Sequence, residues 1–275
     1  MFIRCVKIYH WVVHSLIEFL SEYNIIYVGL TASLIAGLCT GFGAIPIFFT
    51  KEVSHKTLDT MLGFAAGVML AATSFSLIIP AIEYGGSGIQ GATITVIGIM
   101  LGGISLDLMD QHTPHNRILK LTPNGERNNL TKVWLFIIAI TLHNFPEGLA
   151  VGVGFGNGDI GNGMSIAIAI GLQNIPEGLA VALALIREKY STTKAFLIAL
   201  ITGLIEPLGG IIGVGLVQIA QPILPYALAF SAGAMLYVIC DEIIPETQKH
   251  SYGRRATYGL LIGFVIMMFL DVSLG

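Results

Sequence analysis

Two nearly identical polar stretches, 30 positions apart, each interrupt a long apolar run. Residues 143–148 read His-Asn-Phe-Pro-Glu-Gly, and residues 173–178 read Gln-Asn-Ile-Pro-Glu-Gly. An ionised side chain at the centre of a membrane-spanning helix costs about 2.5–3.5 kcal/mol on insertion scales. A polar patch that is duplicated where it is so costly indicates a cation-binding site.

Composition predicts an all-α polytopic membrane protein. Hydrophobic residues make up 54% of the 275 residues and charged residues only 11%, whereas soluble domains carry about 25% charged residues. The lipid bilayer is therefore the expected surrounding, and we expect no nucleic-acid partner.

Eight stretches reach the roughly 20 mostly apolar residues that a membrane-spanning helix requires. These predicted core spans cover residues 25–48, 57–80, 89–108, 132–155, 160–186, 194–219, 224–246 and 256–273. They make residues 25–275 a single transmembrane domain with one longer loop at 109–131.

Residues 1–24 contain a shorter candidate helix at 8–23, which carries His10, His14 and Glu18. Two alternatives stay open for it: a tilted ninth span, or an amphipathic helix that lies in the membrane interface.

Lys and Arg are concentrated in alternate loops. They follow the first, third, fifth and seventh spans, whereas the loops around 81–88, 156–162 and 220–223 contain none. By the positive-inside rule, the basic loops are cytoplasmic and the C-terminus is extracytoplasmic, as in a multi-pass protein of the cell (inner) membrane. Arg4 and Lys7 fit this rule only if the N-terminal helix also spans, which favours a ninth helix.

Both polar stretches fall near the middle of their spans, and the two spans run in opposite directions. Residues four apart share one helix face, so His143 lies above Glu147 and Gln173 lies above Glu177. Inverted repeats with polar sites at the membrane midplane are typical of secondary transporters.

Pro146 and Pro176 interrupt both helices beside these side chains. A proline inside a helix removes one backbone hydrogen bond and displaces the carbonyl four residues earlier, which can turn an oxygen toward an ion. The alternative is a proline-kinked packing motif, with Gly148 and Gly178 at close helix contacts, but packing alone does not require paired glutamates.

Glu206, in the middle of the sixth predicted span, adds a third central carboxylate to Glu147 and Glu177. No Lys or Arg lies at this depth, so the three would repel one another unless protons or cations neutralise them. A divalent cation is the most economical partner, because the imidazole of His143 suits zinc and carboxylate oxygens suit harder ions. Met69, in the middle of the second span, is either a thioether ligand or a core methionine.

Further carboxylates lie toward each side of the membrane. Asp241 and Glu242, about 7–8 Å from mid-span at 1.5 Å per residue, either pass ions toward the cytoplasm or form a charged interfacial helix end. Glu83 and Asp271 either collect cations at the outer surface or are isolated interfacial carboxylates. The 109–131 loop is either a metal-binding segment or a solvated linker, and its candidate ligands are Asp110, His112 and His115.

The two motifs resemble those of the ZIP (Zrt/Irt-like protein) family of divalent metal transporters. The resemblance is specific at His-Asn-x-Pro-Glu-Gly in the fourth span and x-Asn-x-Pro-Glu-Gly in the fifth, and the topology agrees along nearly the whole chain. Gln173 stands where many members have His, which is similar to the bacterial GufA-type branch.

The resemblance implies a binuclear metal site between the fourth and fifth spans. One metal position would be held by Met69, His143, Glu147 and Glu177. The adjacent position would be held by Asn144, Gln173, Asn174 and Glu206, and the glutamates of the two motifs would bridge both. Asp241 and Glu242 would form an exit-side pair, and Glu83 and Asp271 would be entrance acids.

The leading hypothesis is a secondary transporter that takes up divalent ions, commonly zinc and also cadmium, iron or manganese, as substrate. It would hold no prosthetic group, have no enzyme activity, and form a homodimer as is usual in the family. An intramembrane zinc hydrolase would need a second His four positions after the first, which the first motif lacks. A proton or monovalent-cation pathway through the glutamates is the alternative, and in it His143 is incidental.

Overall fold

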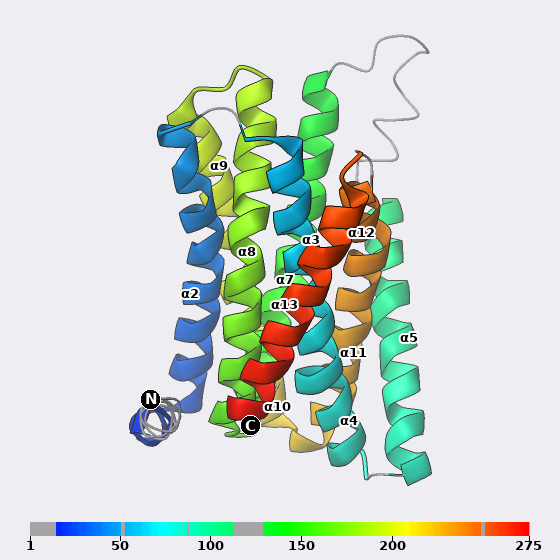
Figure 1. Cartoon of the computed structure of the whole chain (residues 1–275). Helices are drawn as coiled ribbons and strands as arrows, with labels where there is room; N and C mark the ends of the chain where they lie inside the picture. Colours follow the sequence, from blue (N-terminus) through cyan, green and yellow to red (C-terminus); the bar gives the residue numbers. More distant parts are fainter. Residues whose placement is uncertain (1–14, 51–52, 87, 113–128, 249–250, 275) are drawn as a thin grey trace, which may run out of the picture.

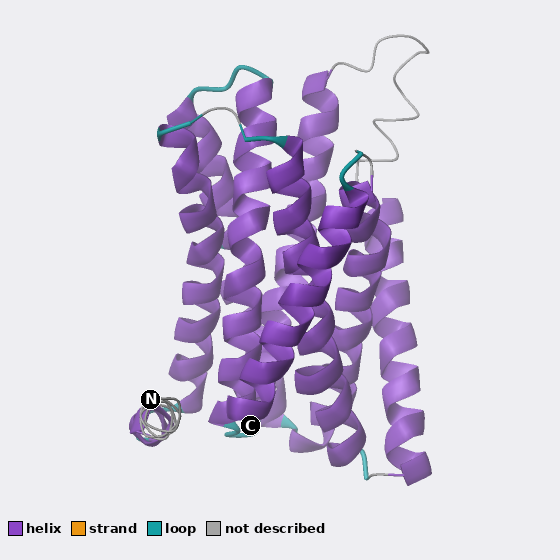
Figure 2. Ribbon diagram, in the orientation of Figure 1, coloured by secondary structure: helices purple, strands orange, loops and turns teal. Residues whose placement is uncertain are grey.

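The structure, a computed structural model, describes residues 15–50, 53–86, 88–112, 129–248 and 251–274. All regular structure in these residues is helical, so the all-α prediction is confirmed for them. Figures 1 and 2 show the helices running up and down in one bundle.

The bundle consists of α2 (Ile25–Ala44), α3 (His55–Ala72), α4 (Ile79–Tyr84), α5 (Gly88–His112), α7 (Asn129–Gly156), α8 (Ile160–Arg187), α9 (Thr192–Gly203), α10 (Glu206–Ile219), α11 (Leu224–Val238), α12 (Ile244–Gln248) and α13 (Gly253–Leu274). Two π-helical segments, η2 (Thr73–Ile78) and η4 (Ile239–Ile243), connect α3 to α4 and α11 to α12. Two short 3-10 turns are η1 (Ile45–Phe48) and η3 (Gln221–Ile223).

Seven helical segments are long and apolar enough to cross a membrane. They are Ile25–Phe48, His55–Tyr84, Gly88–Met109, Ile160–Ile186, Thr192–Ile219, Gln221–Gln248 and Gly253–Ser273. These seven coincide with seven of the eight predicted spans. The remaining one, predicted at 132–155, lies within α7, a helix of 28 residues that is not among the seven.

Polar side chains set where several of these helices begin. The hydroxyl of Ser54 accepts a hydrogen bond from the Thr57 N–H at 3.1 Å, just before α3. The carboxylate of Asp159 accepts one from the Asn162 N–H at 3.0 Å, just before α8. Such an N-cap contributes about 1 kcal/mol to the stability of a helix. Ser54 and Asp159 therefore fix the first residues of α3 and α8 more closely than the apolar pattern of the sequence does.

The described part of the N-terminal helix covers residues 15–21. Figure 1 shows it end-on below α2, so it runs across the bundle and not along it. Leu16 and Phe19 on this helix are exposed. The first half of the candidate helix at 8–23 lies outside the described residues.

The sixth predicted span is interrupted in the middle. α9 ends at Gly203 and α10 begins at Glu206, with Leu204 and Ile205 between them. Pro207 is in the first turn of α10, where its missing N–H removes no helical hydrogen bond. The break therefore puts Glu206 at the start of a helix, where the helix dipole stabilises a carboxylate.

The two motif-bearing helices, α7 and α8, occupy the centre of the bundle. α8 contacts α2, α3, α7, α9 and α13, and α7 also contacts α10 and α11. In the most apolar 18-residue stretch of α8, 72% of the residues are buried, against 22% in α5 and in α13. The motifs are therefore shielded by other helices, whereas α5 and α13 have broad apolar outer faces.

Glycines of the motifs allow backbone contact between helices at this centre. A Cβ on Gly148 of α7 would lie 2.0 Å from the carbonyl oxygen of Glu206, and one on Gly178 of α8 would lie 1.8 Å from that of Thr40. No side chain fits at either position. α7 thus lies directly against the start of α10, and α8 lies directly against α2.

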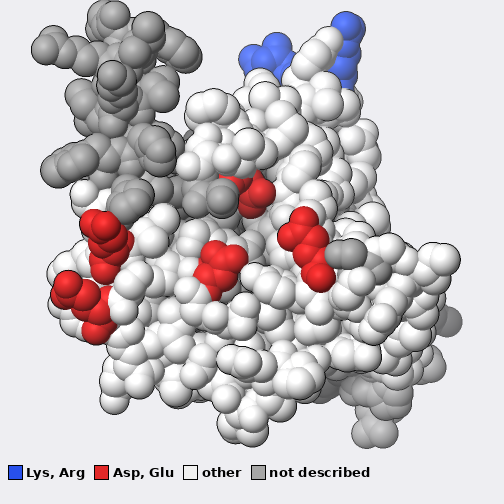
Figure 3. All heavy atoms as spheres, turned by 90° about the horizontal axis from the view of Figure 1, so that it is seen from below, with Lys and Arg blue, Asp and Glu red and all other residues white. Residues whose placement is uncertain are grey.

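The two ends of the bundle differ in charge. The described Lys and Arg side chains lie near the α2–α3, α8–α9 and α12–α13 connections; they are Lys56, Lys189, Lys194, Arg254 and Arg255. The opposite end includes the α4–α5 and α7–α8 connections and carries Glu83, Asp159 and Asp271. Figure 3 looks onto this second end, where carboxylates are spread over the surface and Lys or Arg appear only at the rim.

Replacing Gly67 by Ala should push α3 away from α13. A Cβ at this position would lie 1.9 Å from the carbonyl oxygen of Leu260, so Gly67→Ala should lower the free energy of unfolding by about 1–3 kcal/mol, the range for overpacked cores. The measurement is the midpoint of thermal unfolding in detergent. Gly215→Ala is the matched control, because nothing lies within 4 Å of its Cβ. Equal midpoints for the two variants would contradict the close contact.

Candidate metal-binding site

The structure buries most of the predicted ligands in the middle of α7 and α8 and at the start of α10. The buried polar side chains are His143, Asn144, Glu147, Gln173, Asn174 and Glu206. Glu177 is half-buried. Polar side chains are thus gathered where three central helices meet, as their mid-span depth predicted.

Asn174 connects three helices through its side-chain amide. Its Nδ2 donates to Oε1 of Glu206 at 2.6 Å and to the carbonyl oxygen of Ala36 at 2.8 Å. Its Oδ1 accepts a hydrogen bond from Nε2 of Gln173 at 2.6 Å. Because Ala36 belongs to α2 and Glu206 to α10, this amide holds α8 against both helices.

Glu206 interacts electrostatically with both of the other central carboxyl groups. Glu147 lies beside the side chain of Gln173 and close to Glu206, and Glu206 in turn lies close to Glu177. Each of α7, α8 and α10 thus contributes a glutamate to this polar region, and the role of these glutamates as metal ligands stays a prediction. We call this group, Glu147, Glu177 and Glu206 with the neighbouring amides, the carboxylate–amide centre.

Several oxygen atoms of this centre have no hydrogen-bond partner among the described residues. They are Oδ1 of Asn144, Oε2 of Glu147, Oε1 of Gln173 and Oε2 of Glu206. Leaving a buried polar atom unbonded costs about 1–3 kcal/mol, and such atoms are rare in native proteins. Carboxylate and amide oxygens are ligands for hard and borderline divalent ions, so the centre has the donor atoms that a cation needs.

The centre is not a compact cluster of the usual metal ligands. In the part of the chain that the structure describes, no three His, Cys, Asp or Glu side chains are placed to hold a metal ion together. The donor set is instead mixed, with amides between the carboxylates. His143 is buried one turn before Glu147 on α7.

Met69 is buried in α3, within the hydrophobic cluster that also contains Val151 and Ile170. This position gives the methionine a packing role in the core. A role as thioether ligand stays a prediction.

Asp271 has two hydroxyl partners that the sequence did not point to. Its Oδ1 accepts hydrogen bonds from the hydroxyls of Ser165, at 2.6 Å, and of Ser76. The three residues come from α13, α8 and η2, so the contact joins three helices near the acidic end. A single serine in an apolar run carries no motif, which explains why these two were missed. Glu83, the other predicted entrance acid, is exposed on α4.

On the basic side of the centre, Asp241 is exposed in the π-helical segment η4. Several predicted groups lie outside what the structure describes: the side chains of Glu242, Asp110 and His112, and the whole of His115.

Replacing Asn174 by Ala should destabilise the protein. The change removes the donor to Glu206 and to the Ala36 carbonyl and leaves both acceptors buried, so we expect a loss of about 1–3 kcal/mol in the free energy of unfolding. Thermal unfolding in detergent without added metal measures it. Asn162→Ala, near the start of the same helix, is the control, since that residue contributes only its backbone N–H to a cap. If Asn174→Ala were as stable as this control, the connecting role of Asn174 would be wrong.

The region of the chain that matches a known protein family contains both motifs. A family model described as ZIP zinc transporter matches residues 120–271. The zinc transporter GufA of Myxococcus xanthus is 45% identical over 251 residues, which cover 90% of this chain and 99% of that protein. The zinc transporter ZIPB of Bordetella bronchiseptica is 39% identical, covering 86% of this chain and 78% of that protein. The zinc transporter ZIP11 of Homo sapiens is 36% identical, covering 93% of this chain and the full length of that protein.

Proposed function

The chain belongs to the ZIP family of zinc transporters, as its two motifs predicted, and we propose that it moves divalent transition-metal cations, zinc foremost, across a membrane. The observation that carries the proposal is the buried carboxylate–amide centre with its unbonded oxygens. The relatives quoted above are named zinc transporters. Cadmium, iron and manganese are proposed as further substrates.

The electrostatics of the centre favour a divalent ion. Ionised carboxylates are costly inside an apolar bundle unless a positive charge compensates them. The Lys and Arg residues of the chain all lie outside the middle of the spans, so neither residue type supplies this charge. A divalent cation bound through the carboxylate and amide oxygens would supply it, and it would also use the oxygens that lack a hydrogen bond.

We assign the metal ligands as the family resemblance implies, in two adjacent positions. The first would use Met69, His143, Glu147 and Glu177. The second would use Asn144, Gln173, Asn174 and Glu206, with the two motif glutamates shared. Because the described residues show no preformed cluster of three His, Cys, Asp or Glu ligands, cation binding would have to turn these side chains toward one another.

A route for the cation runs through the centre from the acidic end to the basic end. Asp271, with Ser76 and Ser165 beside it, and Glu83 would receive the ion. Asp241 and Glu242 would receive it from the centre. With the basic loops in the cytoplasm, as the positive-inside rule predicts, this direction is uptake through the cell (inner) membrane, and the C-terminus is extracytoplasmic.

An internal inverted repeat is supported by two matching segments. Ile-Ile-Pro occurs at 78–80 and at 243–245, and in both places its first isoleucine is the last residue of a π-helical segment, η2 and η4 respectively. Figure 1 shows α3 and α11 running in opposite directions. Proline removes a helical hydrogen bond at the equivalent place in both. We infer a repeat in which one bundle of helices moves against the other, as in transporters with midplane sites.

We infer eight spanning helices, with α7 as the one beyond the seven that length and composition identify. A helix of 28 residues is longer than the roughly 30 Å thickness of the apolar membrane interior, at about 1.5 Å per residue. α7 also packs between α8 and α10. The N-terminal helix is proposed to lie in the interface, because its described part runs across the bundle. A homodimer stays a prediction from the family resemblance.

The competing functions receive no support from the comparisons. The relatives are named zinc transporters, which does not favour a proton or monovalent-cation pathway. The matching family is one of transporters, which does not favour an intramembrane hydrolase. Replacing His143 distinguishes metal transport from the proton pathway, because only metal transport requires the imidazole.

Metal uptake into proteoliposomes tests the proposal. Wild type should accumulate zinc, and Glu147→Ala should reduce the initial rate at least about a hundredfold, because a bridging charged ligand is lost; His143→Ala should reduce it about tenfold or more, in line with the roughly 10–100-fold effects of weakening a metal site. Zinc, cadmium, iron and manganese are compared in the same assay.

The matched control is Glu188→Ala, which removes a carboxylate at the end of α8 far from the centre and should leave uptake unchanged. Zinc uptake that survives in Glu147→Ala, in protein that remains monodisperse, would contradict the assigned site. A proton flux that persists in His143→Ala while zinc uptake is absent in wild type would favour the proton pathway.

A further inference from the structure

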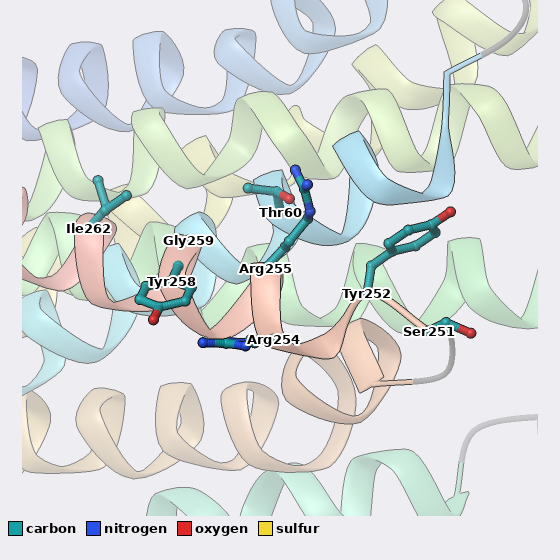
Figure 4. A pocket seen from close by; sticks show the side chains of 8 residues that line it. All are labelled: Thr60, Ser251, Tyr252, Arg254, Arg255, Tyr258, Gly259 and Ile262. Carbon is teal, nitrogen blue, oxygen red and sulfur yellow. The ribbon is translucent and has the colours of Figure 1, made fainter.

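A groove opens on the surface at the basic end of the bundle, between the first turns of α13 and the facing part of α3. Its volume is about 560 Å³, and it is lined by Thr60, Ser251, Tyr252, Arg254, Arg255, Tyr258, Gly259 and Ile262. Figure 4 shows Arg255 extending toward Thr60 of α3, whereas Arg254 points to another side of α13. The groove shares no residue with the carboxylate–amide centre.

The two arginines of the groove bring two positive charges to it. Both are exposed, and no carboxylate of the described residues forms an ion pair with either guanidinium. They also lie in the first turn of α13, where the helix dipole already places partial positive charge. Two cations at a helix start oppose the usual preference for acidic residues there, so an anion bound beside them would relieve this unfavourable interaction.

The position of the groove matches the boundary between the membrane surface and its apolar interior. The apolar segment of α13 begins at Gly253, so the arginines lie at the level of lipid headgroups. Tyr252 and Tyr258 are exposed beside them, as aromatic residues are in membrane interfaces. Ile262, two turns further along α13, is 55% exposed and faces the lipid. The groove is therefore polar and cationic at one end and apolar at the other.

We propose that this groove binds one anionic phospholipid from the leaflet at the basic end, with the lipid phosphate beside Arg255 and with Arg254, on another side of α13, adding to the positive charge that attracts it. Guanidinium groups bind phosphate oxygens through paired, charge-assisted hydrogen bonds. The hydroxyl of Ser251 lies in the same groove and supplies a neutral donor, whereas that of Thr60 donates to the Lys56 carbonyl oxygen at 2.7 Å. An acyl chain would continue along Tyr258 and Ile262, an arrangement that a soluble phosphate ion could not use. The inference rests on the membrane placement proposed above, but not on the identity of the transported ion.

Lipid binding here would clamp α3 to α13. The two helices are in backbone contact beside the groove, since a Cβ on Gly259 would lie 2.4 Å from the carbonyl oxygen of Thr60. At its other end α13 carries Asp271, whose hydroxyl partners connect it to α8 and η2. The lipid would therefore stabilise the helix pair that leads to the acidic end of the proposed route.

Native mass spectrometry of the full chain in detergent tests the proposal. The apparent affinity of the first bound lipid is measured for phosphatidylglycerol and for phosphatidylcholine. Wild type should prefer phosphatidylglycerol roughly tenfold, and the double variant Arg254→Gln/Arg255→Gln should lose that preference, because each basic residue near a headgroup adds a comparable increment. Thermal stabilisation by phosphatidylglycerol should disappear in the same variant.

The control double variant Lys189→Gln/Lys194→Gln removes two exposed positive charges at the same end of the bundle, away from the groove, and should keep the preference. Equal losses in the two double variants would show diffuse attraction and overturn the proposal, as would no preference in wild type. Displacement of the lipid by millimolar inorganic phosphate would assign the groove to a free anion and contradict a lipid site. Zinc uptake in phosphatidylcholine vesicles is measured separately, so failure of transport leaves the lipid result intact.

Discussion

Carboxyl groups buried among apolar helices are the constraint on which the rest of the structure depends. Glu147 and Glu206 are almost completely inaccessible to solvent, and Glu206 interacts electrostatically with both Glu147 and Glu177. Amides supply partial compensation, through the hydrogen bond from Asn174 to Glu206. The remaining unbonded oxygens are those that the proposed divalent cation would use, since it matches both their charge and their chemistry.

The packing around this centre follows from the need to bring three glutamates together. Gly148 and Gly178, each directly after a motif glutamate, allow the backbones of α10 and α2 to touch α7 and α8. The break between α9 and α10 places Glu206 in the first turn of a helix, where its charge is better tolerated. The expectation that Pro146 and Pro176 interrupt their helices is wrong, because α7 and α8 continue through both prolines.

Much of this arrangement was predictable from spacing alone. Mid-span depth and the helical period place His143 over Glu147 and Gln173 over Glu177, because the membrane thickness and the rise of a helix are general. The break at Leu204 was not predictable, since the apolar run continues through it. Nor were the contacts of Asn174 with Ala36 and of Asp271 with two serines, because they depend on which distant helices become neighbours. The ligand assignment of the two metal positions, and of Met69, comes from the family resemblance and stays a prediction.

The most direct test of this account is the amount of zinc that the purified chain binds at equilibrium, measured by dialysis against buffered free zinc. Wild type should retain zinc in a stoichiometric amount, and the isosteric variants Glu147→Gln and Glu206→Gln should each lose most of it, because each replaces a charged oxygen of the centre by a neutral amide. Retention of the same amount by both variants, or no zinc bound to folded wild type, would contradict the claim that a divalent cation neutralises these buried carboxylates.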